Sequence, residues 1–411
     1  MSPFLTQLIP AGNCACHSST TFECSSCVKP QSAALEHNAF PGWEYQYGRD
    51  DKNLGLAEDQ CAVAFPGLFE DLHRALDYWT QVGKFTSATL DSYGVVHGVT
   101  KAIIYDGQLY VLATKSKAQD HRRKVIATLS SIHRAIAAFP DRHSLPNIEF
   151  LFSIEDKAED VASDGLPIWV LARKAREESV WLMPDFGFGV WDNIIDDSNN
   201  EIGPYDEVVE KAMEVEEGLS FDDKQPKLVW RGKLSFAPKL RRALLDQSRG
   251  QDCSDVKELN WDAKQNYLPL ETTASTSLLH TSKACRSVLV LHALQYIQHH
   301  HYLLVSSGPL QNYVEVKRDF SDLSAKMSNM LDHPAKAEKI ADNSVKTFRE
   351  RYLTPAAEAC YWRALWRAYA QASEPADPWR LEADGTRTKR GLRYEMFLLM
   401  SSEDMLDFAV R

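Results

Sequence analysis

Short apolar runs alternate with amphipathic helical segments along most of this chain, and this alternation restricts the fold more than any other feature. The predicted strands are 43–47, 101–105, 109–113, 148–154, 167–172, 181–183, 228–230, 256–259 and 287–291. The predicted helices are 60–82, 117–138, 205–217, 238–247, 321–331, 334–352 and 355–371. Strands that alternate with helices in both halves of a chain predict an α/β fold with two sheets.

The clearest local signal is a hairpin near residue 106. The runs 101–105 and 109–113 flank Asp106-Gly107, a dipeptide that favours a two-residue turn between antiparallel strands. We therefore expect these two runs to pair directly.

Length and charge limit the classes of function. The chain has 411 residues, more than one core normally serves, so we expect two domains of roughly 150–200 residues each. The net charge is −11 and no long basic run occurs, which argues against a nucleic-acid partner.

No apolar run reaches the length of a membrane span, and the short apolar segment 3–10 is a poor signal peptide. Either the chain is cytosolic, or an N-terminal anchor is absent from this sequence.

The cysteines allow two interpretations. The eight are Cys14, Cys16, Cys24, Cys27, Cys61, Cys253, Cys285 and Cys360. The first four form a C-x-C and a C-x-x-C, which with His17 are candidate zinc ligands, although C-x-C is an unusual half-site. The alternative, which we favour, is a disulfide-tied N-terminus of a secreted protein.

The first candidate site is Arg231-Gly232, which ends the apolar run 228–230. Ligands of open α/β folds bind at the carboxyl ends of strands. A guanidinium there suits a diphosphate because its planar fork donates paired hydrogen bonds, and glycine lets the backbone approach closely. Taken alone, however, an arginine after a strand is more often simply exposed to solvent.

The second candidate is Asp156, which follows the apolar run 148–154. A partly desolvated carboxylate at a cleft can serve as a general base that accepts the proton of a substrate hydroxyl. Without further context, a helix cap or an ordinary loop carboxylate is the simpler interpretation.

Metal binding has little support in the sequence. The run His299-His300-His301 is conspicuous, but adjacent side chains point in different directions and rarely form one site. No Asp-x-Asp pair, which could hold a divalent ion against a diphosphate, is present. We therefore expect no metal and no other cofactor.

Together and in this order, several stretches resemble the fungal capsule-associated transferases of glycosyltransferase family 90. This family also contains the animal protein O-glucosyltransferases and O-xylosyltransferases. The matching stretches are 146–150 (PNIEF), 181–187 (WLMPDFG), 227–232 (KLVWRG), 299–309 (HHHYLLVSSGP), 314–323 (VEVKRDFSDL) and 348–362 (FRERYLTPAAEACYW). The similarity runs from about residue 43 to the C-terminus.

The resemblance implies a GT-B-like fold, in which two Rossmann-like domains face a cleft and the C-terminal helices cross back to the first domain. On this basis the expected divisions are a cysteine-rich lead-in (1–38), an acceptor-side domain (39–225), a donor-side domain (226–355) and C-terminal helices (356–411). The family transfers sugars with inversion and without a metal ion. The implied reaction moves glucose or xylose from a UDP-sugar to a glycan or protein hydroxyl.

The resemblance also assigns residues and a compartment. Asp156 matches the catalytic carboxylate and Arg231 the diphosphate-binding arginine, with Gly232, Ser306 and Ser307 as further donor contacts. Family members act in the lumen of the ER or Golgi, usually behind an N-terminal anchor. That context favours disulfides, and it implies that Cys360 is tied to a cysteine in the N-terminal part.

The chain departs from the family pattern in its donor-binding region. After Thr281 the family continues with a Gly-rich turn, a second arginine and a helix before the stretch that matches Cys285, but here only three residues intervene. Two adjacent parallel strands need a crossover of about a dozen residues, which three cannot supply. Lys283 is a poorly matched substitute for the lost cation, and Gln295-Tyr296 stands where the family usually has Glu-Trp.

Three hypotheses follow from this gap. The chain is an enzyme with an impaired donor site, a glycan-binding protein of the same fold without turnover, or an incomplete gene model of an ordinary enzyme. The transcript across Thr281–Cys285 distinguishes the third hypothesis from the other two.

Overall fold

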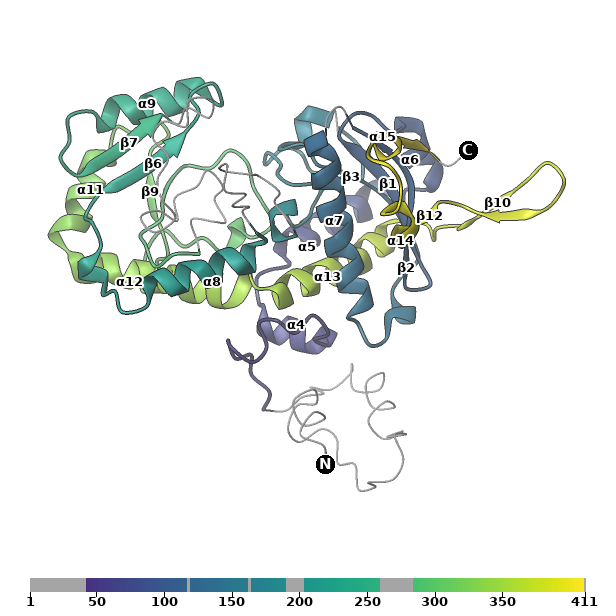
Figure 1. Ribbon diagram of the computed structural model, residues 1–411, viewed down its shortest axis with the longest axis horizontal. Coiled ribbons are helices and arrows are strands. Elements are labelled where there is room, and N and C mark those ends of the chain that lie inside the picture. Colours follow the sequence, from purple (N-terminus) through teal and green to yellow (C-terminus); the bar gives the residue numbers. More distant parts are fainter. Residues whose placement is uncertain (1–41, 117–118, 162–163, 190–202, 259–283, 410–411) are drawn as a thin grey trace.

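A computed structural model of the chain describes residues 42–116, 119–161, 164–189, 203–258 and 284–409. This part of the chain is a mixed α/β protein with two lobes (Figure 1). The larger lobe contains a seven-stranded sheet with helices packed against it. The smaller lobe contains short strands and helices from the second half of the chain.

The helices occur along the whole described chain. The α-helices are α4 (Glu58–Ala64), α5 (Glu70–Val82), α6 (Ser87–Tyr93), α7 (Gln119–Ala137), α8 (Tyr205–Glu216), α9 (Pro238–Ser248), α11 (Leu323–Asp332), α12 (Pro334–Ser344), α13 (Pro355–Ala372), α14 (Tyr394–Phe397) and α15 (Ser402–Leu406). The other helical turns are η2 (Arg142–Ser144), η3 (Ala158–Val161), η4 (Phe186–Phe188), η5 (Phe221–Asp223), η6 (His301–Leu303) and the π-helical η7 (Val345–Tyr352).

The strands of the described residues fall into one large sheet and three strand pairs. They are β1 (Val99–Tyr105), β2 (Gln108–Lys115), β3 (Ile148–Ser153), β4 (Trp169–Val170), β5 (Trp181–Leu182), β6 (Leu228–Gly232), β7 (Ser254–Glu258), β8 (Val290–His292), β9 (Val314–Val316), β10 (Trp379–Leu381), β11 (Arg387–Lys389), β12 (Leu392–Arg393) and β13 (Asp407–Ala409).

The large sheet is mixed. Its order is β12-β2-β1-β3-β4-β5, and β13 also pairs with β2. β1 pairs antiparallel with β2 and β3, whereas β3, β4 and β5 run parallel. All six residues of β3 are buried, as expected for an apolar run that is covered on both faces. The strands β3, β4 and β5 therefore form a parallel region of the sheet, and the residues that follow their carboxyl ends lie at one edge.

The predicted hairpin is confirmed. β1 and β2 pair antiparallel up to Tyr105 opposite Gln108, and Asp106 and Gly107 have φ angles of 49° and 63°. Two successive positive φ angles match the right-handed twist of the flanking strands. A side chain at Gly107 would also meet the carbonyl oxygen of Arg142 at 2.7 Å, so glycine is required there for space as well.

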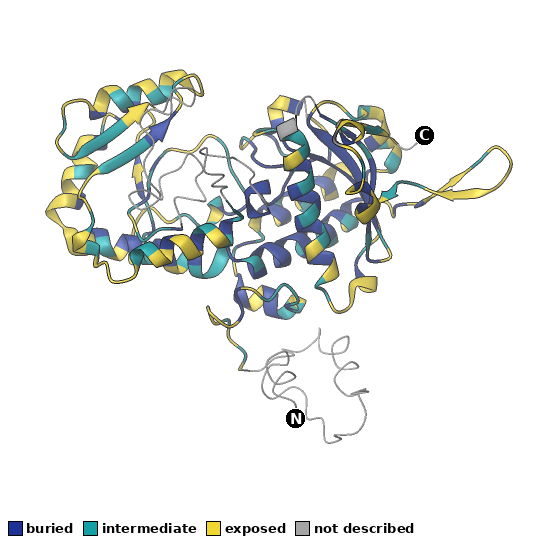
Figure 2. Cartoon of the chain, in the orientation of Figure 1, coloured by how far each residue is buried: buried dark blue, intermediate teal, exposed yellow. Residues whose placement is uncertain are grey.

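Helix α13 crosses back from the second half of the chain and fills the core of the larger lobe, as expected. It packs against α5 and α7 beneath the sheet. The Tyr361 hydroxyl donates a 3.0 Å hydrogen bond to the Leu182 carbonyl, and the Tyr369 hydroxyl donates a 2.9 Å bond to the Pro167 carbonyl. Figure 2 shows the buried residues concentrated in this lobe. The sheet and α13 therefore form one core.

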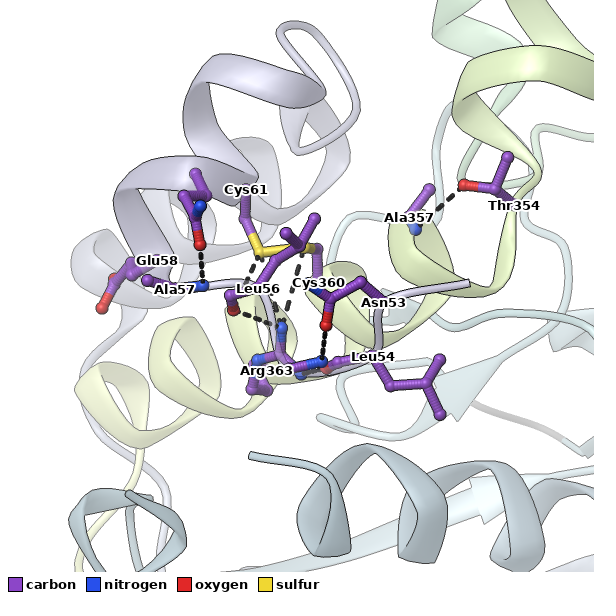
Figure 3. Close-up of a disulfide and its surroundings, with 12 residues drawn as sticks. Asn53, Leu54, Leu56, Ala57, Glu58, Cys61, Thr354, Ala357, Cys360 and Arg363 are labelled. Carbon is purple, nitrogen blue, oxygen red and sulfur yellow. Dashed lines mark hydrogen bonds between the residues drawn. A yellow bond between two sulfur atoms is a disulfide. The ribbon is translucent and has the colours of Figure 1, made fainter. Parts of the chain in front are cut away.

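A disulfide between Cys61 and Cys360 fastens α13 to α4 (Figure 3). Both cysteines are buried, and the Arg363 guanidinium lies beside both sulfur atoms. Arg363 also donates hydrogen bonds to the carbonyl oxygens of Leu54 and Leu56, at 2.7 and 2.9 Å. The expected bond from Cys360 to a cysteine in the N-terminal part is therefore confirmed. The cluster Cys14–Cys27 lies outside the described residues.

Two predictions near the N-terminus are wrong. The segment 60–82 is two helices, α4 and α5, because Pro66 has no N–H to donate and its ring clashes with the preceding turn. The segment 43–47 is not a strand; it leads into a turn held by Asp50, whose side chain accepts a 2.8 Å hydrogen bond from the Gln46 N–H. In both places local chain geometry overrides the apolar pattern.

In the smaller lobe, β6 pairs parallel with β7, and β8 pairs parallel with β9. Side chains of both pairs share one apolar cluster with α9 and α11, which includes Trp230, Val290 and Val316. Among the described residues the two pairs are separate two-stranded sheets. The structure thus establishes a mixed α/β protein, and the GT-B arrangement of two Rossmann-like domains stays a prediction.

None of the helices in the described part of the chain is long and apolar enough to cross a membrane.

Candidate functional site

The parallel strands β3, β4 and β5 end side by side, and their carboxyl ends carry polar residues. Asp156 follows β3, Arg173 follows β4 and Asp185 follows β5. Polar groups at this edge of an α/β sheet are where such folds bind ligands. We therefore take this edge as the candidate site.

Asp156 lies on a bend directly after β3, and its side chain is exposed. The bend is held at its start by a 2.9 Å hydrogen bond from the Ile154 N–H to the Gly98 carbonyl. Gly98 has a φ of +81°, and a Cβ there would meet the Glu155 carboxylate at 2.5 Å. At its end, the Ala158 N–H donates a 3.0 Å bond to the Ala172 carbonyl after β4. With both anchors in place, the Asp156 side chain is exposed to solvent.

A segment from the second half of the chain, residues 296–302, lies across this strand edge. Ile297 and Arg173 exchange two backbone hydrogen bonds of 2.7 and 3.1 Å. The Tyr296 hydroxyl donates a hydrogen bond to the Glu159 carboxylate in η3, next to the Asp156 bend. The turn that follows Asp156 and the end of β4 are therefore in direct contact with the second half of the chain.

A buried charge network fixes the same segment deeper in the protein. The Asp71 carboxylate on α5 accepts hydrogen bonds from Arg74 (3.0 Å), Arg173 (2.9 Å) and the Tyr302 hydroxyl (2.8 Å). Burial alone would raise the pKa of Asp71, but the hydrogen bonds and charges of Arg74 and Arg173 outweigh it, and the pKa is lowered. The carboxylate thus stays ionised and ties α5, the end of β4 and η6 together.

The three adjacent histidines do not point at one centre. The ring planes of His299 and His300 are 84° apart, and those of His300 and His301 are 82° apart. His299 packs against the aromatic rings of Phe188 and Tyr361. Within the described ranges, no group of three or more His, Cys, Asp or Glu side chains is placed to hold a metal ion. Independence from metal stays a prediction.

A small polar pocket lies between α7, α8 and α13, away from Asp156, and Glu358 is buried there at the start of α13. Its carboxyl is hydrogen-bonded to the Ser131 hydroxyl, and Arg134 lies 3.7 Å away. Burial raises the pKa of Glu358, and the Arg134 charge only partly opposes this. Phe188 and Tyr205 line the same hollow.

Arg231 and Gly232 end β6, as predicted, but Arg231 already has an internal partner. Its guanidinium donates a 2.6 Å hydrogen bond to the Asp255 carboxylate and another to the Asp255 carbonyl, both on β7. Hydrogen bonds from the Lys257 and Arg231 side chains lower the pKa of Asp255. Figure 1 shows β6, which carries Arg231, and β3, which precedes Asp156, in different lobes.

The remaining predicted donor contacts are placed as follows. Ser306 and Ser307 are exposed on the turn after η6. The turn is closed by Asn312, which is buried and whose side-chain oxygen accepts a 2.9 Å hydrogen bond from the Val305 N–H. Lys283 lies outside the described residues, as do Thr281 and Ser282 at the gap.

Sequence reasoning missed Asp71, Arg173, Tyr302 and Glu358. Each lies in a segment whose sequence pattern predicts that charged and hydroxyl side chains are exposed to solvent. The burial of Asp71, Arg173 and Glu358 follows from contacts with residues far away in the sequence, and the hydrogen bond between Tyr302 and Asp71 joins residues 231 positions apart. No local pattern could have singled them out.

Comparison with known proteins now places the chain. No curated protein matches it at a significant level. The model of one family, described as glycosyl transferase family 90, matches residues 58–382. The matched region includes both Asp156 and Arg231 and extends from α4 to β10, through both lobes. Because this match spans well over half of the 411 residues, the chain belongs to glycosyl transferase family 90.

Proposed function

We propose that this protein transfers glucose or xylose from a UDP-sugar to a hydroxyl group of a glycan or protein, with inversion and without a metal ion. Membership of the family supports sugar transfer, and the resemblance to its capsule-associated members supports a glycan acceptor. One observation carries the proposal. Asp156 is an exposed carboxylate at the end of a fully buried strand, at the edge that the second half of the chain crosses.

In the proposed step, the Asp156 carboxylate accepts the proton of the acceptor hydroxyl while that oxygen bonds to the anomeric carbon of the sugar. The bond from this carbon to the β-phosphate oxygen breaks, and its electron pair leaves with UDP. A single attack from the opposite face inverts the configuration. Arg231 stabilises the charge on the leaving diphosphate, and Gly232 allows close approach. Ser306, Ser307 and Lys283 are further proposed donor contacts.

The ion pair between Arg231 and Asp255 favours a second candidate function. A diphosphate must compete with the Asp255 carboxylate, which accepts a 2.6 Å hydrogen bond from the guanidinium. The sequence also lacks the family's second arginine and Gly-rich turn. A protein that binds glycans in the same fold without turnover is the alternative.

The test is transfer by the purified chain, measured as UDP release and as product mass, with UDP-glucose or UDP-xylose and an oligosaccharide acceptor. Asp156→Asn is expected to abolish transfer and leave UDP binding unchanged. Glu155→Gln is the matched control, because it neutralises the neighbouring carboxylate, and it should keep wild-type activity. Transfer by Asp156→Asn at the wild-type rate would remove Asp156 from the mechanism. Acceptor binding by a wild-type chain that releases no UDP would favour the second candidate.

Two further parts of the proposal concern metal and compartment. Transfer is expected to persist in a chelator, and loss of activity that manganese or magnesium restores would contradict this. We place the protein in the lumen of the secretory pathway, because the buried Cys61–Cys360 disulfide suits an oxidising compartment.

A further inference from the structure

Tyr296 is the centre of a small cluster that joins the second half of the chain to the Asp156 bend. It lies between β8 and η6 and is half-buried. Its hydroxyl donates a hydrogen bond to Glu159, and the ammonium groups of Lys157 and Lys174 lie 5.3 and 5.4 Å from the centre of its ring. Lys174 also forms an ion pair with Glu159.

At neutral pH the protonation states of Tyr296 and Glu159 favour the hydrogen bond between them. Burial and the hydrogen bond to Glu159 raise the pKa of Tyr296, so its hydroxyl keeps its proton and donates. Bonds from Lys174 and Tyr296 lower the pKa of Glu159, so it stays an acceptor. The two lysines meet the electron-rich face of the ring. Each of these contacts contributes little on its own near the surface. Together, however, the contacts of Tyr296 and Lys174 restrain the short segment that contains Lys157 and Glu159.

Two residues of this cluster are close neighbours of Asp156 in the sequence, so their contacts restrain the backbone beside it. Lys157 directly follows Asp156, and Glu159 lies in the next turn, η3. The other side of the bend is held by the bond from Ile154 to Gly98. Contacts with Tyr296 therefore add side-chain restraint to the end of the bend, where the bond from the Ala158 N–H to the Ala172 carbonyl is the backbone anchor.

We propose that Tyr296 is a positioning residue, which holds the Asp156 carboxylate in place for the reaction by fixing residues 157–159. This inference rests on the proposed function, in which Asp156 is the base. Tyr296 does not touch the reacting atoms; it acts through Lys157 and Glu159. Binding of the donor at β6 does not depend on it.

Three substitutions separate the contributions of the hydroxyl and the ring. Tyr296→Phe removes the bond to Glu159 and keeps the ring beneath the lysines. Tyr296→Trp keeps a ring and an N–H donor, and Tyr296→Ala removes both. The matched controls are Tyr105→Phe and Tyr105→Ala. The Tyr105 ring also lies near an ammonium group, 5.6 Å from Lys389, but at the opposite end of the sheet.

The first measurement is steady-state transfer by the full chain. Misplacement of a catalytic group by about 1 Å can cost roughly a hundredfold in rate, so kcat of Tyr296→Ala should fall by roughly tenfold to a hundredfold. Tyr296→Phe should fall less, and Tyr296→Trp should retain most of the rate. KM for the UDP-sugar should be unchanged in all three variants. A purely structural role predicts instead a lowered Tm with unchanged kcat in the folded protein.

The second measurement is amide hydrogen exchange of residues 154–161, which needs no turnover. Protection there should fall in Tyr296→Ala, fall less in Tyr296→Phe and stay at the wild-type level in both Tyr105 variants. Wild-type kcat and wild-type protection in Tyr296→Ala would overturn the inference, as would an equal loss of protection in Tyr105→Ala. Full transfer by Asp156→Asn would overturn the proposed base, and with it the role assigned to Tyr296. The exchange measurement would then still show whether Tyr296 restrains the bend.

Discussion

Cys61 and Cys360 form a disulfide between residues that are 299 positions apart in the sequence. The bond joins α4, near the start of the described chain, to α13, which enters the core of the larger lobe from the second half. It therefore closes most of the chain into one covalent loop.

Replacement of both cysteines, Cys61→Ala with Cys360→Ala, is expected to lower the free energy of unfolding by about 2–5 kcal/mol. The disulfide restricts the unfolded chain, and long loops gain most from closure. Urea unfolding followed by fluorescence measures the change. Cys253→Ala is the control, since Cys253 is half-buried and forms no disulfide with any described residue. A double variant as stable as this control would contradict the expectation.

Asp71→Asn should destabilise the protein by about 3–5 kcal/mol at neutral pH, because it leaves Arg74 and Arg173 facing an uncharged group in a buried network. The pKa of Asp71 is lowered in the folded state, so its contribution is present above the unfolded pKa and is lost as pH falls through the folded pKa. The difference between variant and wild type should therefore shrink in acid.

Urea titrations from about pH 3 to pH 7 test this dependence. The control is Asp77→Asn, an exposed carboxylate on the same helix, whose effect should be small at every pH. An equal loss of stability in the two variants would show that the buried network is not the cause.

Glu358→Gln should have the opposite pH dependence. Burial raises the pKa of Glu358 above the ordinary value of 4.5, so the stability that this group contributes is present below the unfolded pKa and is lost as pH rises through the folded pKa. The glutamine amide would keep a polar group beside Ser131 without the cost of a buried charge. The variant should match wild type near about pH 4 and be the more stable of the two near about pH 8.

Thermal unfolding at a series of pH values measures this crossover. Glu214→Gln, on the exposed face of α8, is the control and should show no such trend. A stability gain that is constant with pH would mean that titration of Glu358 is not responsible.

Arg231→Ala is expected to weaken UDP-sugar binding by roughly tenfold, because one charge-assisted hydrogen bond contributes about 1.5–3 kcal/mol. The chain itself should bind at least about tenfold more weakly than a family member that keeps the Gly-rich turn and second arginine, for the same reason. Calorimetric titration measures both affinities. Arg249→Ala removes an exposed arginine near β7 and should bind as wild type does. Affinity equal to that of an intact relative would show that another group replaces the lost cation.

The parts of the fold that could be predicted are those specified by local sequence patterns. The Asp106-Gly107 turn specified its hairpin, and the apolar run at 148–154 specified β3, because both depend on neighbours in the sequence. Strands of two or three residues, such as β12 and β13, carry no comparable signal. They are strands only because β2 offers them a partner.

The sequence by itself determined most of the longer helices and strands, the position of Asp156 after a buried strand and that of Arg231 at the end of β6, since periodicity and turn chemistry act over a few residues. Only the tertiary structure decided which polar groups meet. It placed Tyr296 against Glu159 and turned Arg231 toward Asp255. Such contacts depend on how the packed core orients whole elements, and that information is distributed over residues as far apart as Leu54 and Arg363, which are separated by 309 positions.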